Sequence, residues 1–221
     1  MAVKQDPFIK ILAKTIKRAV SVDEITKKKF KELELPPEFK KLLGTPECSG
    51  IWIIWGESFN GKTGFSLQLA KALTLSGKVF YNTLEEGARK SMQNAIVAQN
   101  MQEVKNRFTI GNREGIDDLK ERLRRKKSPD IIFIDSLQYT GLNKKEYKLL
   151  KEEFHNKLFI FISHADGKNP EGSLAKFVKY DADVKIRVEG YRAMCLSRLG
   201  GDKEPYTIWE QGAAQFDLKI K

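Results

Sequence analysis

Residues 51–63 read Ile-Trp-Ile-Ile-Trp-Gly-Glu-Ser-Phe-Asn-Gly-Lys-Thr. The first five form a continuous apolar run, which is typical of a strand buried on both faces. Residues 56–63 fit G-x-x-x-x-G-K-S/T in full, the pattern of a glycine-rich loop between a strand and a helix. Glycines let backbone amides approach phosphate groups, and a helix N-terminus favours their negative charge. This stretch therefore predicts an α/β fold built around a phosphate-binding loop.

The chemistry of this loop assigns roles to its residues. Lys62 is placed to reach the β- and γ-phosphates of a nucleotide, and the Thr63 hydroxyl is placed to ligate Mg²⁺. The predicted ligand is ATP with Mg²⁺; the structural alternative is a glycine turn that binds nothing. The residues expected to contact the nucleotide are Gly56, Glu57, Ser58, Phe59, Asn60, Gly61, Lys62, Thr63 and Gly64.

Carboxylates follow two further apolar segments. Residues 131–134 are apolar and end in Asp135, a Walker B pattern whose carboxylate holds Mg²⁺ through water beside the phosphate-binding loop. Glu85 comes soon after the apolar residues 79–81, where a carboxylate could orient the attacking water. Glu86 is expected to cap the next helix, whose macrodipole favours acids at that end. The alternative is that both glutamates serve only as caps.

His164 is the fourth candidate, directly after a strand expected over residues 158–163. A polar side chain there could sense the γ-phosphate and move the following loop when ATP becomes ADP. The structural alternative is a surface histidine with satisfied hydrogen bonds. We group His164 with Lys62, Glu85 and Asp135 as candidate catalytic residues.

The first part of the chain predicts an N-terminal helical arm over residues 1–45, as a packing or oligomerisation element. Asp6 has the character of an N-cap for a first helix. Ser21 and Glu24 have the spacing of a capping box and open a second helix toward Leu35. Two prolines then break that helix, and a third, short helix ends at a glycine.

The remaining residues, 46–221, alternate between strand and helix patterns. This alternation predicts a mostly parallel central sheet flanked by helices. The expected parallel strands lie at 51–55, 78–83, 108–110, 131–135 and 158–163, and the expected helices at 61–76, 86–99, 114–127 and 144–154. Three antiparallel C-terminal strands are expected at 182–188, 191–197 and 206–210. The 221 residues suit one domain with an extra element, or two small domains.

The order and spacing of these motifs resemble the RecA-like ATPases from about residue 50 to the end. Residues 79–86, Val-Phe-Tyr-Asn-Thr-Leu-Glu-Glu, resemble the family strand that ends in its catalytic glutamate. Residues 134–138, Ile-Asp-Ser-Leu-Gln, resemble the Walker B of the RadA/Sms recombination branch. Residues 161–164 and the Gly-Lys and Glu-Gly pairs that follow resemble the RadA sensor strand and DNA-facing loop. DnaB-type helicases and KaiC-like proteins are cousins of that branch.

The resemblance implies an assembly and a substrate. Members of this family form rings or filaments with ATP between neighbouring subunits, and two loops face single-stranded DNA in the central channel. These loops correspond here to residues 137–143 and 165–176, which makes Lys168 and Lys176 candidate DNA-binding residues. The implied role is in DNA recombination, repair or replication, with a possible protein partner from one of those processes.

The sequence departs from the RadA pattern in ways that affect catalysis. It contains neither the four-cysteine zinc finger nor the protease-like domain of RadA proteins. The family's Lys-Asn-Arg-Phe-Gly motif corresponds to residues 196–200, Leu-Ser-Arg-Leu-Gly, so only Arg198 matches. Arg198 could act in trans as an arginine finger, and is a candidate catalytic residue on that ground. The equally open alternative is a plain surface arginine, and weak hydrolysis without a partner is expected.

Charge adds a separate indication. Forty basic and 29 acidic residues give a net charge of +11 and a pI near 9.5, which favours contact with a polyanion such as nucleic acid. The alternative is that the charge only confers solubility. A dense basic run at residues 122–127 could grip phosphates, but we favour a solvated helix end stabilised by the macrodipole.

Other classes are not expected. No apolar run reaches membrane-spanning length, and the first residues lack the apolar block of a secretion signal. Two cysteines and two histidines do not predict a His/Cys metal site. The expected location is the cytoplasm, with no membrane partner.

Three functions compete on these grounds. We favour a minimal RecA-fold ATPase that couples Mg-ATP hydrolysis to single-stranded DNA. The alternative is a slow or non-hydrolysing ATP-dependent switch or loader that regulates a protein partner. A P-loop kinase for a small molecule is disfavoured, because it needs an arginine-rich lid that the segment after Ser163 does not provide.

Overall fold

The computed structural model describes residues 18–202 and 204–220 and divides into two compact units, Met1–Phe30 and Lys31–Lys221. In the first unit, Ser21 and Glu24 form the expected capping box at the start of α1 (Val22–Lys27). The helix ends at Lys27 instead of continuing toward Leu35. No residue of α1 is buried, and a helix this short gains little from its backbone alone. The first helix expected from Asp6 lies outside the described residues.

The second unit begins upstream of the boundary expected at residue 46. Leu33 is buried, and α2 (Pro37–Leu43) buries Phe39, Leu42 and Leu43 in the same core as the sheet. Pro37 starts this helix, because a proline at the first helical position loses no hydrogen bond. The packing and oligomerisation role of residues 1–45 stays a prediction.

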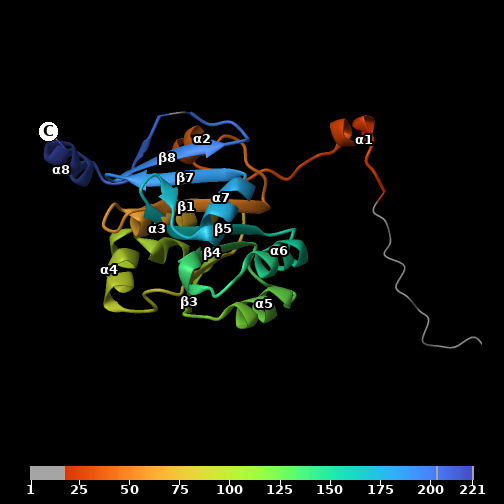
Figure 1. Cartoon of the computed structure of the whole chain (residues 1–221), viewed down its shortest axis with the longest axis horizontal. Coiled ribbons are helices and arrows are strands. Elements are labelled where there is room, and N and C mark those ends of the chain that lie inside the picture. The colour runs from red at the N-terminus through yellow and green to blue at the C-terminus, as the bar shows by residue number, and fades with distance from the viewer. Residues whose placement is uncertain (1–17, 203, 221) are drawn as a thin grey trace, which may run out of the picture. The chain divides into compact units, whose positions relative to one another are not determined.

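The core of the second unit is a nine-stranded mixed sheet in the order β3-β2-β4-β5-β1-β7-β8-β9, with β6 paired to β5 (Figure 1). The parallel strands are β1 (Gly50–Gly56), β2 (Val79–Thr83), β3 (Phe108–Asn112), β4 (Ile131–Asp135), β5 (Leu158–Asp166) and β7 (Val184–Glu189). The antiparallel strands are β6 (Asn169–Pro170), β8 (Arg192–Ser197) and β9 (Tyr206–Thr207). This confirms the predicted mostly parallel sheet with antiparallel C-terminal strands.

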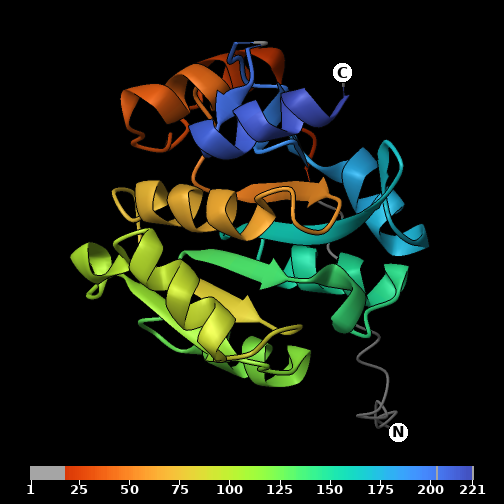
Figure 2. The ribbon, with the colours of Figure 1, turned by 90° about the vertical axis from the view of Figure 1, so that its left-hand side faces the viewer.

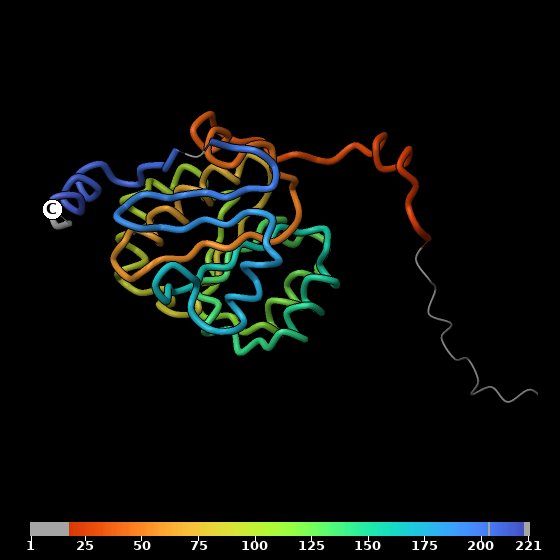
Figure 3. Tube along the Cα trace, turned by 45° about the horizontal axis from the view of Figure 1, so that its top comes forward, coloured from red at the N-terminus to blue at the C-terminus, as the bar shows by residue number. Residues whose placement is uncertain are grey.

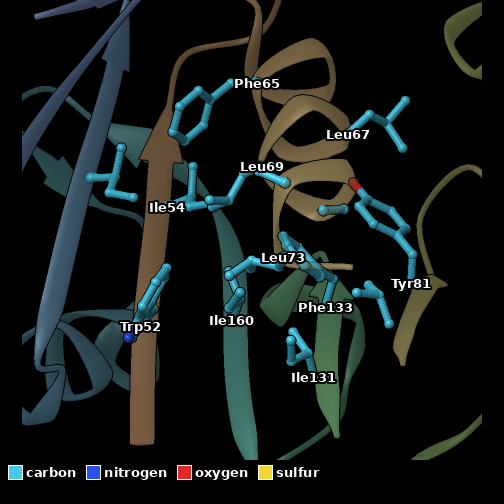
Figure 4. Packing of buried hydrophobic residues seen from close by; sticks show 14 of the residues in the cluster. Trp52, Ile54, Phe65, Leu67, Leu69, Leu73, Tyr81, Ile131, Phe133 and Ile160 are labelled. Atoms are coloured by element: carbon cyan, nitrogen blue, oxygen red, sulfur yellow. The ribbon is translucent and has the colours of Figure 1, made fainter. Parts of the chain in front are cut away.

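Helices cover both faces of the sheet. One face packs against α2, α3 (Lys62–Leu73) and α4 (Lys90–Ala98), the last two lying along the sheet in Figure 2. The other face packs against α5 (Ile116–Arg124), α6 (Lys144–Glu153) and α7 (Ser173–Asp181). Alternate residues of β1 divide between the two cores: Trp52 and Ile54 belong to the core that contains α3, and Figure 4 shows Ile54 beside Leu69. Both faces of this strand are therefore buried, as its apolar run predicts.

Short 3₁₀ turns complete the connections, at η1 (Met101–Val104) and η2 (Leu137–Tyr139). Figure 3 follows the β7–β8 hairpin alongside β1, with its turn at Gly190 and Tyr191, both at positive φ. Of the described residues, no helix is long and apolar enough to span a membrane.

Two helices were not predicted. The segment expected as the loop 165–176 instead forms the end of β5, the short β6 and the start of α7. The strand expected over residues 206–210 stops at Thr207, and α8 (Glu210–Ile220) begins after it. Ala213 of α8 is buried, and the ring of Phe216 fills the space beside Gly190. The tertiary contact with the β7–β8 turn gives this helix a packing surface.

Candidate functional site

Parallel pairing brings the predicted residues to one edge of the sheet. Gly56 pairs with His164 across β1 and β5, and Thr83 pairs with Asp135 across β2 and β4. The phosphate-binding loop, the end of β2 and the end of β4 therefore lie side by side, where ligands of open α/β sheets bind.

A cavity of about 450 Å³ opens at this edge. It brings together Lys62, Thr63, Glu85, Asp135 and His164, which come from separate strand and loop ends of the chain. The full lining is Ser58, Phe59, Gly61, Lys62, Thr63, Gly64, Glu85, Glu86, Asp135, His164 and Tyr191. Gly56, Glu57 and Asn60 are in the adjoining loop and do not line the cavity.

The loop itself is held by its own polar groups. The Lys62 ammonium donates to the Glu57 carbonyl oxygen at 2.8 Å, and burial lowers the pKa of Lys62 despite the nearby carboxylates. The Asn60 side-chain oxygen accepts from the Gly190 amide at 2.7 Å, which ties the loop to the β7–β8 turn. Gly61 adopts φ +96° just before α3, a conformation that favours glycine. Phe59 stands 94% exposed at the tip.

Asp135 is held by a hydrogen bond from a tyrosine of the neighbouring strand β2. The Tyr81 hydroxyl donates to Asp135 Oδ2 at 2.6 Å, while no lysine, arginine or histidine of the described residues forms an ion pair with this carboxylate. The pKa of Asp135 is raised to about 6: burial is the largest cause and the charges of Glu85 and Glu86 add to it, while Tyr81 and Lys62 oppose it. A partly buried carboxylate that lines the same cavity as a threonine suits Mg²⁺, which binds through one or two protein oxygens plus substrate phosphates.

Glu85 and His164 contact each other in the lining of the cavity. Nε2 of His164 lies 3.0 Å from Oε2 of Glu85, and both side chains are partly buried. The Glu85 carboxylate is thus positioned by an imidazole rather than by the helix that follows. The peptide bond between Asp135 and Ser136 is cis.

Glu86 does not cap the next helix, and this expectation was wrong. Helix α4 begins at Lys90 with Arg89 at its N-cap position. The Gly87 amide donates to Thr83 Oγ1, so a turn closes immediately after Glu86 and delays the helix. Glu86 instead lines the cavity and accepts a hydrogen bond from Ser91 at 3.1 Å.

Three side chains in and around the candidate site were missed from the sequence. Tyr81 holds Asp135, and Tyr191 lines the cavity while its amide donates to the Asn60 carbonyl. Gln138 donates to Ser163 Oγ at 2.8 Å and to the Glu171 carbonyl at 3.0 Å. For Tyr81 a signal existed, because a tyrosine hydroxyl in the middle of a buried strand needs a partner.

Arg198, Lys168 and Lys176 lie outside the cavity. Arg198 follows β8, whose Ser197 pairs with Val184 at the start of β7, so it lies at the opposite edge of the sheet from the phosphate-binding loop. Its guanidinium is 3.9 Å from Asp183. Lys168 lies in the turn between β5 and β6, and Lys176 on α7 pairs with Asp166 at 3.2 Å.

Solved structures share this architecture. The flagellar accessory protein FlaH from Methanocaldococcus jannaschii matches with a TM-score of 0.58 and 17% identity, over 81% of this chain and 97% of that one. The KaiC-like protein PH0186 from Pyrococcus horikoshii OT3 matches at 0.57 and 16%, over 80% and 94%. The ATPase domain of a DnaB-type helicase matches at 0.55 and 14%, over 83% and 90%. The chain has the RecA-like P-loop ATPase fold.

At these identities the RecA-like neighbours establish the fold alone. No protein-family model and no curated protein matches the sequence. The predicted fold is thereby confirmed, whereas closeness to the RadA branch in particular stays a prediction. The roles of the individual site residues rest on the geometry described above.

Proposed function

We propose that this RecA-like protein binds Mg-ATP at the cavity, hydrolyses it, and couples hydrolysis to the binding of single-stranded DNA. The observation that carries the proposal is the Glu85–His164 pair at 3.0 Å, facing Lys62 and Asp135 within one cavity. A phosphate-binding loop alone supports binding only. A carboxylate held opposite that loop supports hydrolysis as well.

Each residue has a distinct part in this reaction. Lys62 and the loop amides hold the β- and γ-phosphates, and Thr63 and Asp135 hold the metal. Bound Mg²⁺ supplies positive charge to the phosphate oxygens. Glu85 accepts a hydrogen bond from the attacking water and orients it toward the γ-phosphorus. Catalysis is then mainly positioning and charge stabilisation, as phosphoryl transfer requires.

His164 provides the route from the nucleotide to the outer segments. The Glu171 amide donates to the His164 carbonyl at 2.9 Å, and Gln138 bridges Ser163 to Glu171. When His164 exchanges Glu85 for the γ-phosphate, the strand end that carries β6 and α7 changes its contacts. In a switch of this kind, a change of charge at one site alters the contacts of a more distant segment.

Single-stranded DNA is the proposed partner because the protein has a net charge of +11 and because basic residues lie at the hairpin formed by β5 and β6. Lys168 is the stronger of the two predicted DNA contacts, since Lys176 already pairs with Asp166. We further propose that the chain works as a ring or filament, with residues 1–45 in the assembly contact and recombination, repair or replication as the setting.

Arg198 favours a second function, an ATP-dependent switch or loader with slow turnover that regulates a protein partner. If Arg198 completes a neighbour's site, catalysis depends on assembly. If Arg198 serves only to contact Asp183, the protein has no arginine finger from this position and hydrolyses ATP slowly. The Arg198→Ala variant separates these cases, since only a trans finger makes turnover fall.

Steady-state ATP hydrolysis with and without single-stranded DNA, at low and moderate salt, tests the main proposal. We expect DNA to stimulate hydrolysis, and salt to weaken the stimulation by screening phosphate contacts. Glu85→Gln should lower turnover by roughly 10²–10⁴-fold while ATP still binds. Glu86→Gln, one residue away in the same cavity, should lose far less.

Two results would contradict the proposal. If Glu86→Gln abolished turnover and Glu85→Gln did not, the base would be misassigned. Tight ATP binding without DNA-stimulated turnover in the wild type would leave the switch or loader as the better interpretation.

A further inference from the structure

Three cationic side chains gather where α7 meets β7, and we call them the α7–β7 cluster: Lys179, Lys185 and Arg187. Lys185 and Arg187 are alternate residues of β7 and therefore share one face of the sheet. They pair in register with Ile53 and Trp55 of β1. Lys179 extends from α7 over the Trp55 ring, with its ammonium 4.6 Å from the ring centroid.

The cluster has few negative partners. Arg187 pairs with Glu189 at 2.7 Å, and Lys179 donates to the neutral Asn169 side chain at 2.9 Å. No ion pair of Lys185 occurs among the residues described (18–202 and 204–220). One carboxylate thus serves three cations. Burial lowers the pKa of Lys179, and the nearby charges of Lys185 and Arg187 lower it further.

The basic run 122–127 differs from the cluster in its exposure, because four of its five cationic side chains are exposed. In the run 122–127, Arg122 binds both carboxylate oxygens of Glu114, and Arg124 pairs with Glu153. These pairings agree with a solvated, structural role for that run. The α7–β7 cluster differs because its residues are half-buried and repel one another.

Partly buried like charges cost free energy that a bound anion recovers. A phosphate group suits this cluster, because lysine and arginine both bind phosphate oxygens by charge-assisted hydrogen bonds. The cluster also adjoins the β5–β6 hairpin. Asn169 belongs to β6, and the Trp55 indole donates to the Lys168 carbonyl at 3.3 Å. A chain of phosphates reaching Lys168 can therefore continue over the cluster.

We propose that Lys179, Lys185 and Arg187 form a phosphate-binding surface for the backbone of single-stranded DNA, continuous with the hairpin at Lys168. The proposal rests on the proposed function, and extends the DNA contact from the hairpin onto the sheet face. Contacts to phosphates carry no base readout, so binding here is independent of sequence.

The test is fluorescence anisotropy of a labelled oligothymidylate titrated with full-length protein across a range of salt concentrations. The variant is Lys179→Gln/Lys185→Gln. The matched control is Lys126→Gln/Lys127→Gln, which removes the same charge from exposed positions of the basic run. Two lost phosphate contacts should reduce the slope of log affinity against log salt by about 1.4, at ~0.7 per contact on a single strand. The control should leave the slope nearly unchanged.

A charge-retaining variant, Lys179→Arg/Lys185→Arg, should restore both affinity and slope. If the glutamine double variant folds poorly, the arginine double variant and the single variant Lys185→Gln still test the proposal. If the slope of log affinity against log salt were the same for the cluster variant and its control, the inference would be overturned. The lost charges would then affect DNA binding only through the net charge of the protein.

The same proteins distinguish the other outcomes. If the wild type does not bind the oligonucleotide, the proposed function itself fails. If the cluster variant keeps its DNA slope but binds a fluorescent ATP analogue more weakly, the phosphates held here belong to the nucleotide of a second copy. That outcome overturns the DNA assignment.

Discussion

Two buried tyrosines of this protein each donate a hydroxyl hydrogen bond of 2.6 Å to an aspartate. The two aspartates differ in whether a cationic side chain also contacts them. Tyr81 binds Asp135 at the proposed nucleotide cavity, and Tyr147 of α6 binds Asp181 of α7. Lys151 completes the second pair with contacts of 2.8 and 2.9 Å to Asp181. Among the described residues, Asp135 has no such cation.

The difference appears in the protonation of the two aspartates. Burial is the largest single influence on both aspartates and acts to raise the pKa. For Asp181 the hydrogen bonds from Lys151 and Tyr147 outweigh burial, so its pKa is lowered. For Asp135 burial prevails and the pKa rises to about 6. Among the described residues, the first aspartate therefore lacks the cationic partner that Lys151 gives to the second.

Replacing each aspartate by asparagine should give the largest contrast. Asp135→Asn removes the carboxylate proposed to hold Mg²⁺ and should lower ATP turnover by roughly 10²-fold or more. Asp181→Asn should change turnover only a few-fold. Steady-state hydrolysis at saturating Mg²⁺ measures both, and equal losses would remove the distinction between the two pairs.

The same substitutions should shift stability in opposite directions at pH 7. The raised pKa of Asp135 means that the folded state binds a proton the unfolded state lacks between about pH 4 and 6. Its contribution to stability is therefore lost as pH rises through that window. Asp135→Asn, which cannot ionise, should be more stable than wild type at pH 7 by at most ~3 kcal/mol, with the gain vanishing below about pH 4.

Asp181→Asn should be less stable than wild type at pH 7, by about 1–3 kcal/mol, because Lys151 loses its partner. The lowered pKa of Asp181 gives stability that is present above its unfolded value of 3.8 and is lost as pH falls through the folded value. Denaturant unfolding in EDTA between pH 3 and 8 measures both variants. Shifts of the same sign at pH 7 would contradict the assigned pKa directions.

Removing each hydroxyl sharpens the comparison further. Tyr81→Phe keeps the ring stacked on Phe133 but frees Asp135, and should raise the half-saturating Mg²⁺ concentration for binding a fluorescent ATP analogue by about 10-fold. Tyr147→Phe is the matched control, and should cost about 1 kcal/mol of stability without moving the Mg²⁺ midpoint. A shift of that midpoint in both variants would indicate a general structural effect.

The smallest expected effect comes from removing the lysine beside Asp181, which leaves this aspartate, like Asp135, with a tyrosine as its hydrogen-bond partner. Lys151→Met retains much of the stem but removes the cation from Asp181, and should lower stability by about 1 kcal/mol, since both side chains are partly exposed. The pH dependence of Asp181 should then move toward that of Asp135. If the dependence of stability on pH were unchanged at low pH, the pKa of Asp181 would be lowered by Tyr147 and not by Lys151.

Local sequence patterns predicted the strands and the phosphate-binding loop because each depends on neighbouring residues. The apolar runs of β1, β4 and β5 appear where expected. Helix α7 was missed although Leu174, Ala175 and Val178 recur at helical spacing, because the family resemblance assigned that segment to a loop. Glu86 was misjudged because the turn at Gly87 depends on the distant Asn112 and Arg113 packed against it.

The sequence by itself predicted a nucleotide-type phosphate site after β1 and determined that Asp135 ends a buried strand. Only the tertiary structure decided which charges are satisfied. It placed Tyr81 beside Asp135, His164 beside Glu85 and Lys179 above Trp55, through a strand order in which chain neighbours are not sheet neighbours. Hydrogen bonds and ion pairs across such a sheet depend on positions far apart in sequence, so no local pattern encodes them.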